Sequence, residues 1–177
     1  MRRWQPSAVT IACLLLAAGP ALAAELRADI KQATQTGTGD PLGTVTISDG
    51  SGGASIKTAL KGLPPGPHGF HIHQNGSCQP NTANNQPVPA GAAGGHYDPN
   101  NAGKHEGPEG NGHLGDLPLL QVAQDGNANQ NLAAPHIKDL SGLKGKAVVI
   151  HGGGDNYSDQ PQPLGGGGAR IACGILE

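Results

Sequence analysis

Two histidines in the segment HGFHIHQNGSC, residues 68–78, have the spacing of a metal-binding pair. In an extended strand, His71 and His73 project from the same face, roughly 6.8 Å apart along the chain at about 3.4 Å per residue. Both imidazoles can reach one ion, because metal–nitrogen bonds are about 2.0 Å long. We interpret this strand as half of a metal site.

A glycine-rich segment downstream supplies further candidate ligands. The chain from Gly91 to Asp116 is too rich in Gly, Pro and Asn for sheet or helix, and we interpret it as a long loop around an ion. His105, His113 and Asp116 are close enough in sequence for a folded backbone to bring their side chains to one point. With His96 they make three imidazoles and a carboxylate, a closed tetrahedral set suited to zinc.

The remaining histidines define a second candidate set. His71, His73 and His151, with His96 if it is shared, form an all-imidazole site without carboxylate or sulfur. Imidazole suits copper, zinc, iron and nickel, so the ligand type leaves the metal of this second site open.

Two histidines are expected outside both sets. His68 is three residues before His71 and faces the other side of the strand, so we expect a hydrogen-bonding core residue. His136 follows Pro135 in a turn-rich region, and we expect it at the surface.

Short strands must position these side chains. Period-two patterns predict strands at residues 25–34, 42–48 and 54–60. We expect further strands at residues 68–73, at residues 117–123 with a continuation to about residue 133, and in the apolar segments 146–151 and 170–176. We expect a turn at residues 36–41 and a hairpin connection at DGSGG, residues 49–53. Residues 74–117 show no periodicity, and no segment has a helical one. The predicted fold class is all-β, a sandwich or barrel.

The first 23 residues have the features of a cleaved signal peptide. Arg2 and Arg3 precede a short apolar run at residues 8–18, and Ala21-Leu22-Ala23 is a cleavage signal. The apolar run is about half of the ~20 residues that span a bilayer. We therefore expect an exported single domain at residues 24–177, with no membrane attachment after cleavage.

Composition narrows the choice of partners and the kind of core. Loss of the two leader arginines leaves 9 basic against 13 acidic residues, a net charge of −4 with neutral histidines. No basic stripe exists, so we expect no nucleic-acid partner. The only aromatic residues after cleavage are Phe70, Tyr97 and Tyr157. A core of small aliphatic side chains would benefit from covalent or metal cross-links.

Two cysteines remain after the leader, which contains Cys13, is removed. An even pair in an oxidising compartment favours a disulfide between Cys78 and Cys173. The alternative is that both thiolates bind a metal. We favour the disulfide because the histidines already supply a full ligand set and neither cysteine lies in a CxxC motif.

The motifs resemble those of the copper-zinc superoxide dismutases, in particular the bacterial periplasmic branch. The similar strings are HGFHIHQNGSC, GGHYDP, GKHEGP, HLGD, VIHGGGDNYSD and GGGGARIACGI, and the resemblance covers nearly the whole chain from Gly43 onward. It implies an eight-stranded antiparallel Greek-key β-barrel or sandwich with long metal-binding and electrostatic loops. It also implies an antioxidant enzyme of the periplasm, a monomer or homodimer, that converts superoxide to dioxygen and hydrogen peroxide.

The resemblance implies one copper and one zinc ion per subunit. The copper ligands would be His71, His73, His96 and His151, and the zinc ligands would be His96, His105, His113 and Asp116. In this scheme copper cycles between Cu(II) and Cu(I), and zinc is structural. The shared His96 would bridge the ions and pass a proton to the departing peroxide.

Further roles also follow from the resemblance. Asp155 matches an acid that joins a copper histidine to a zinc histidine, and Arg170 matches the active-site arginine that holds the anionic substrate. Cys78 and Cys173 match the family's intrachain disulfide. The loop before Arg170 contains no Lys or Arg, so Lys104 is the one candidate for steering superoxide toward the site.

A copper- or zinc-binding carrier of the same fold, without turnover, is the alternative function. Non-enzymatic relatives typically lose a copper ligand or the arginine. Here His151, Asp155 and Arg170 all stand in their places, which favours the enzyme.

Overall fold

The structure is a computed structural model that describes Met1 and residues 24–177. The predicted signal peptide, with Cys13, lies outside the described residues apart from Met1. Among the residues that are described, no helix has the length and apolar character needed to cross a membrane.

Antiparallel strands dominate the described chain. One curled sheet has the strand order β5-β10-β11-β1-β2-β3-β9, and two small sheets pair β4 with β8 and β6 with β7. The strands are β1 (Glu25–Thr34), β2 (Gly37–Ser48), β3 (Ala54–Leu60), β4 (Gly66–His68), β5 (Phe70–His73), β6 (Asn81–Ala83), β7 (Gln86–Val88), β8 (Leu120–Val122), β9 (Asn131–Ala134), β10 (Ala147–His151) and β11 (Arg170–Ile175). Three single turns of 3₁₀ helix are η1 (Gly91–Ala93), η2 (Ser141–Leu143) and η3 (Leu164–Gly166).

The predicted all-β antiparallel class is confirmed, although the count of eight strands is not exact. The expected strand at residues 68–73 is divided at Gly69 into β4, which pairs with β8, and β5, which pairs with β10. If β4 and β5 are counted as one strand, eight principal strands remain, and the β6–β7 hairpin is an addition.

The core is built from aliphatic side chains around Phe70. Burial alternates along β1 and β3, so that one face of each strand packs inward and the other faces solvent. All four residues of β5 are buried, in contrast. Phe70 and Ile72 belong to the core cluster, and the alternation of the strand turns His71 and His73 to its opposite face. The strand that carries the histidine pair is therefore covered on both sides.

The expected turn at residues 36–41 is wrong. Strand β2 begins at Gly37 and pairs with β1 through Thr34↔Gly37 and Ala33↔Thr38. Pro41 is accommodated because the register shifts on both sides of Lys31, its partner in β1. A proline has no N–H for the ladder and is tolerated at such bulges.

The segment 74–117 contains a hairpin that its lack of periodicity did not predict. Strands β6 and β7 are joined by Asn84 and Asn85, whose φ angles are +50° and +58°. Two consecutive residues with positive φ are typical of the two-residue hairpin turn, for which Asn is well suited. Apart from this hairpin and η1, the expected long loop is confirmed.

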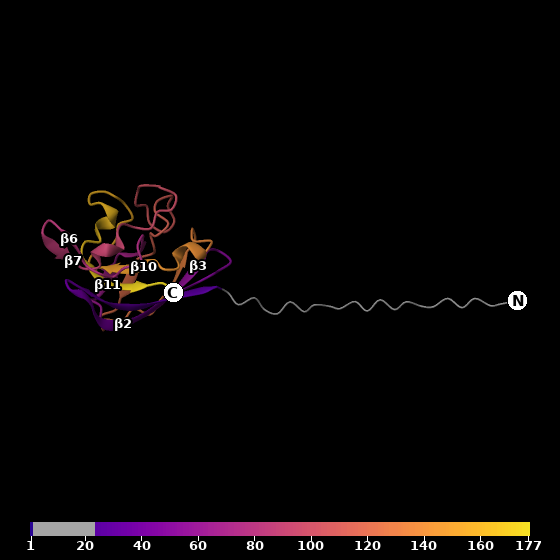
Figure 1. Ribbon diagram of the computed structural model, residues 1–177, viewed down its shortest axis with the longest axis horizontal. Coiled ribbons are helices and arrows are strands. Elements are labelled where there is room, and N and C mark those ends of the chain that lie inside the picture. The colour runs from indigo at the N-terminus through magenta and orange to yellow at the C-terminus, as the bar shows by residue number, and fades with distance from the viewer. Residues whose placement is uncertain (2–23) are drawn as a thin grey trace.

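The two long loops gather on one side of the sheet. Figure 1 shows the segments around residues 80–115 and 155–168 above β10 and β11, whereas β2 lies on the opposite side. Because β5 and β10 are hydrogen-bonded neighbours, with His71 opposite Val149, the histidines of both strands meet beneath these loops.

A disulfide ties the first long loop to the last strand. Cys78 and Cys173 are bonded with a Cα–Cα distance of 5.7 Å and a sequence separation of 95 residues. The predicted pairing is confirmed, and neither cysteine is a metal ligand.

We expect the double substitution Cys78→Ser, Cys173→Ser to lower the free energy of unfolding by about 2–5 kcal/mol, because the closed loop is long. Chemical denaturation of the oxidised protein and the variant would measure this loss. The wild type in reductant is the matched control and should lose a similar amount. Equal unfolding midpoints for all three samples would show that the cross-link does not contribute to stability.

Candidate metal centre

The structure brings together both predicted sets of side chains. Each residue offers one ligand atom, and within each set these atoms all lie within 4.8 Å of one another; the sets are His71, His73, His96 and His151, and His96, His105, His113 and Asp116. His96 belongs to both sets. The histidines come from β5, β10 and the long loop, so the sheet and the loop together assemble the centre.

Backbone and carboxylate acceptors orient the first set toward a common point. The Nδ1 atom of His73 donates to the carbonyl of Gly94 at 2.9 Å, and Nδ1 of His151 donates to that of Gly168 at 3.3 Å. Their Nε2 atoms, which then carry lone pairs, face each other at 3.4 Å. Two lone pairs at this distance repel each other unless a cation lies beside them. This arrangement fits a metal ion.

Two unpaired nitrogens complete the first set. Nδ1 of His71 and Nε2 of His96 are buried and have no hydrogen-bond partner. Unpaired buried polar atoms are costly, and two such imidazole nitrogens in one set fit the binding of a metal ion. The rings of His71 and His96 are stacked, with centroids 4.0 Å apart, and one ligand atom from each lies within 4.8 Å of those of the other members of the set.

The second set converges on one carboxylate. Nδ1 of His96 lies 2.8 Å from Oδ1 of Asp116, Nδ1 of His105 lies 2.9 Å from Oδ2, and Nδ1 of His113 lies 3.4 Å from Oδ1. The His105 and His113 nitrogens are buried and poorly aligned for hydrogen bonds to Asp116. Three imidazoles around one carboxylate have the donor chemistry of a tetrahedral zinc site.

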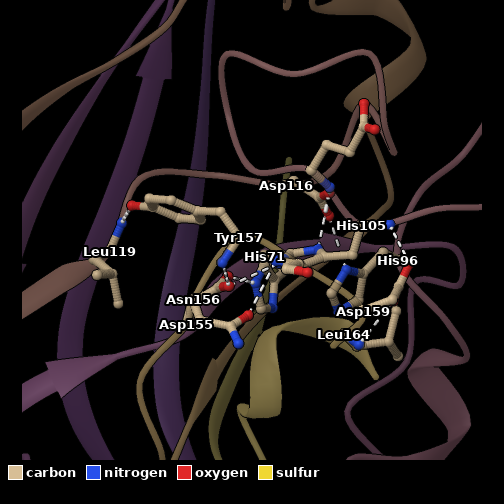
Figure 2. A network of polar contacts seen from close by, with 12 residues as sticks. His71, His96, His105, Asp116, Leu119, Asp155, Asn156, Tyr157, Asp159 and Leu164 are labelled. Carbon is tan, nitrogen blue, oxygen red and sulfur yellow. Dashed lines mark hydrogen bonds and ion pairs between the residues drawn. The ribbon is translucent and has the colours of Figure 1, made fainter. Parts of the chain in front are cut away.

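One buried carboxylate joins the two sets. Oδ2 of Asp155 accepts from Nε2 of His71 at 2.7 Å, and its Oδ1 accepts from Nε2 of His105 at 2.7 Å, as Figure 2 shows. The Tyr157 amide also donates to Oδ1 at 2.8 Å. Each histidine thus keeps its proton on Nε2 and presents Nδ1 to its own set, so Asp155 selects the tautomer of both.

Burial and charge set the protonation of the centre. Burial lowers the pKa of His96 to about 4 and that of His151 to about 3, so both imidazoles are neutral at pH 7. Burial alone would also lower the pKa of His105, but its contacts with Asp116 and Asp155 outweigh burial and raise the pKa to about 9. Burial would raise the pKa of both carboxyls, yet their histidine partners hold it well below the usual range. Ionised carboxylates and neutral imidazoles are the forms that bind cations, so an ion bound by His105 must displace the extra proton of this residue.

Arg170 is anchored beside the first set by two carbonyls. Its Nη1 atom donates to the carbonyl of Ala90 at 2.7 Å, and Nη2 donates to that of Gly94 at 2.6 Å. The Gly94 carbonyl also accepts from His73. Arg170 is partly exposed, so a fixed positive charge lies beside the first set at a residue that solvent can reach.

The other predicted residues lie outside both sets. His68 is buried, with Nδ1 at 2.7 Å from the carbonyl of His151 and Nε2 at 2.8 Å from that of Pro64, which confirms the predicted hydrogen-bonding core residue. His136 is exposed, as expected. Lys104 is paired with Glu106 at 2.8 Å, so its charge is locally offset, which weakens the prediction that it steers the substrate.

Comparison with known proteins decides the family. The family described as "Copper/zinc superoxide dismutase (SODC)" matches residues 42–176. The chain belongs to this family. Superoxide dismutase (Cu-Zn) 2 of Salmonella typhimurium is 55% identical over 163 residues, which cover 92% of this chain and 94% of the relative. Superoxide dismutase (Cu-Zn) of Escherichia coli K12 is 51% identical over 169 residues, which cover 96% of this chain and 97% of the relative.

Solved structures of Cu/Zn superoxide dismutases show the same fold. The enzyme from Brucella abortus has a TM-score of 0.85 and 50% identity, over 87% of this chain and 100% of that one. The monomeric enzyme from Salmonella enterica has a TM-score of 0.77 and 56% identity, over 87% of this chain and 100% of that one. The predicted family, a superoxide dismutase with copper and zinc as cofactors, is confirmed, and none of these relatives favours the carrier alternative.

Several positioning residues of this copper/zinc superoxide dismutase fold were not predicted. Asp159 accepts from the amide of His105 at 2.8 Å and from that of Leu164 at 3.0 Å, so it fixes one loop against the other (Figure 2). Gly165 has a φ of +72°, and a Cβ there would collide with Oδ1 of Asp155. Its only sequence signal is its place in the run of four glycines before Ala169.

Proposed function

We propose that this superoxide dismutase would hold copper with the first set and zinc with the second, and that His96, which belongs to both sets, would serve as a ligand in each. The copper ligands are then His71, His73, His96 and His151, and the zinc ligands His96, His105, His113 and Asp116. The observation that carries this assignment is the orientation of His96, whose Nδ1 faces Asp116 while its unpaired Nε2 faces the other histidines. The all-imidazole set suits copper, and the set with the carboxylate suits zinc.

Copper, when bound, supplies the one-electron chemistry that oxidises one superoxide and reduces the next. Arg170 binds the superoxide anion, because its guanidinium is held by two carbonyls and keeps further N–H donors for a ligand. His96 can hold a proton at Nε2 when that atom is not bonded to a metal, and can pass this proton to the departing peroxide. Burial of His71 and His73 excludes water from one side of the centre.

Elemental analysis of the purified mature protein, with superoxide consumption on the same sample, tests the proposed function. About one copper and one zinc per chain with fast turnover support it. Two zinc ions per chain, or no copper after copper has been offered, with no turnover, would favour a metal carrier.

We further propose that residues 1–23 are removed and that residues 24–177 act as one domain in the periplasm. The leader features, the disulfide and the bacterial relatives support this location. We propose a monomer, because the similar Salmonella enterica protein is described as monomeric. The mass and N-terminal sequence of the protein in a periplasmic extract would test the cleavage, and light scattering would test the monomer.

Asp155→Asn is expected to weaken the binding of both metals by roughly 10–100-fold, the usual effect of changing a residue that orients a metal ligand. An amide has one acceptor oxygen and cannot accept from His71 and His105 through two atoms, as the carboxylate does. Competition with a chelator would measure both affinities. Asp125→Asn, at an exposed turn, is the matched control and should change neither. If Asp155→Asn left both metal affinities unchanged, the contacts of Asp155 with His71 and His105 would not be what orients these ligands.

A further inference from the structure

The second set, which we assign to zinc and call the zinc set, has one side chain that is partly exposed to solvent, and its other side chains are buried. The side chains of His96, His105 and Asp116 are 0–1% exposed, whereas that of His113 is 11% exposed. An ion that enters or leaves the folded protein must exchange ligands one at a time. His113 is therefore the first zinc ligand that it meets.

A cavity reaches the zinc set from the His113 side. It has a volume of about 270 Å³, and its lining includes His113, Asp116, Asn100 and His136. Two of the four zinc-set residues line it, and none of the histidines assigned to copper does. The cavity thus leads to one of the two metal positions and not to the other.

His136 is held at this cavity by an anchored turn. It follows β9, and the next residue, Ile137, is buried in the core. The amide of Ile137 donates to the carbonyl of Ala134 at 3.2 Å, and its carbonyl accepts from the amide of Ala54 at 2.8 Å. His136 itself is exposed and has no part in the centre described above. An imidazole is thereby kept at the solvent side of a cavity whose inner wall contains a zinc ligand.

The charges around the cavity favour a cation. The carboxylate of Asp116 lies in the cavity lining, and that of Asp98 accepts from the amide of Ala102, a lining residue, at 2.9 Å. Lys138, two residues after His136, does not line the cavity, and its Nζ donates to the carbonyl of Gly52 at 3.1 Å. The cavity can attract a divalent ion electrostatically.

We propose that this cavity is the route by which zinc reaches its site, and that His136 is a transient ligand that captures the hydrated ion and transfers it to His113. Each step exchanges one ligand of the ion for another: an imidazole nitrogen of His136 replaces a water, and His113 then replaces His136. The inference rests on the zinc set of the proposed function. His136 is absent from the final site, so it affects the rate of exchange and not the equilibrium.

The test is the kinetics of zinc binding to the chelator-stripped, disulfide-intact mature protein. Zinc chloride is added at low micromolar concentration, and uptake is followed by competition with a chromophoric chelator. We expect His136→Gln to slow both uptake and release by on the order of tenfold, a change of about 1.4 kcal/mol in each barrier, with an unchanged dissociation constant. Lys138→Gln, in the same turn but outside the cavity lining, is the control and should match the wild type.

The outcomes separate this inference from the proposed zinc site. If His136→Gln and the wild type each bound one zinc ion with equal rates of uptake and release, the proposed access route would be wrong, and the assignment of the zinc ligands would stand. A weaker dissociation constant with unchanged uptake would overturn the transient role, because His136 would then act on the final site. Failure of the wild type to bind zinc would overturn both proposals.

Discussion

Replacing His151 with alanine is expected to abolish superoxide consumption while one zinc ion stays bound. His151 lies only in the set that we assign to copper, where its Nε2 faces that of His73 at 3.4 Å. Its loss removes one of four imidazoles and opens the site to water. The fall in activity should exceed the roughly 10–100-fold effect of changing an outer partner of a ligand. Elemental analysis and superoxide consumption on one sample would measure both effects.

His113→Ala is the reciprocal control for this prediction. His113 belongs only to the set that we assign to zinc, so its replacement should release zinc and leave copper bound. Equal loss of both metals in each variant would contradict the assignment, because the two sites would then not be separable.

Removing both metals with a chelator is expected to lower the melting temperature by about 15 °C or more. At a free metal concentration 1,000 times the dissociation constant, each ion adds about 4 kcal/mol of stability, and 1 kcal/mol shifts the melting temperature of a domain of this size by about 2–4 °C. The stripped centre also keeps unpaired buried nitrogens on His71, His96, His105 and His113. Calorimetry before and after chelation would measure the shift.

Re-addition of zinc and copper should restore the original melting temperature, which controls for damage by the chelator. The same experiment on the Cys78→Ser, Cys173→Ser variant would show whether the metals stabilise the loops without the disulfide. An unchanged melting temperature on chelation of the wild type would mean that the metals do not contribute to the stability of the fold.

Part of the grouping of the metal ligands could be predicted from the sequence, because several of these ligands are close together along the chain. His71 and His73 are two residues apart on a strand, and strand geometry alone places both on one face. The sequence could also group His105, His113 and Asp116, because the loop between them is short and rich in glycine. The strand pattern 54–60 matches β3 residue for residue, since one face of that strand is core and the other is solvent.

Other features of the fold and the site could not be predicted, because they depend on backbone groups or on short exposed segments that have no characteristic residue types. Any residue can offer the carbonyls that Ala90 and Gly94 give to Arg170. Strand β2 was predicted to begin too late, because Gly37–Pro41 is mostly exposed and resembles a turn in composition. The β6–β7 hairpin is so short and exposed that no core face gives it a period.

The carbonyl of Gly94 has a consequence for how the centre forms. It accepts from His73, a proposed copper ligand, and from Arg170, the proposed substrate ligand. The segment that carries it lies between the disulfide at Cys78 and His96, the residue that belongs to both sets. A chain in which this segment is displaced would misplace a ligand and the arginine together. Formation of the proposed copper site and of the superoxide-binding site is thus coupled, so a partly folded chain would lose both together.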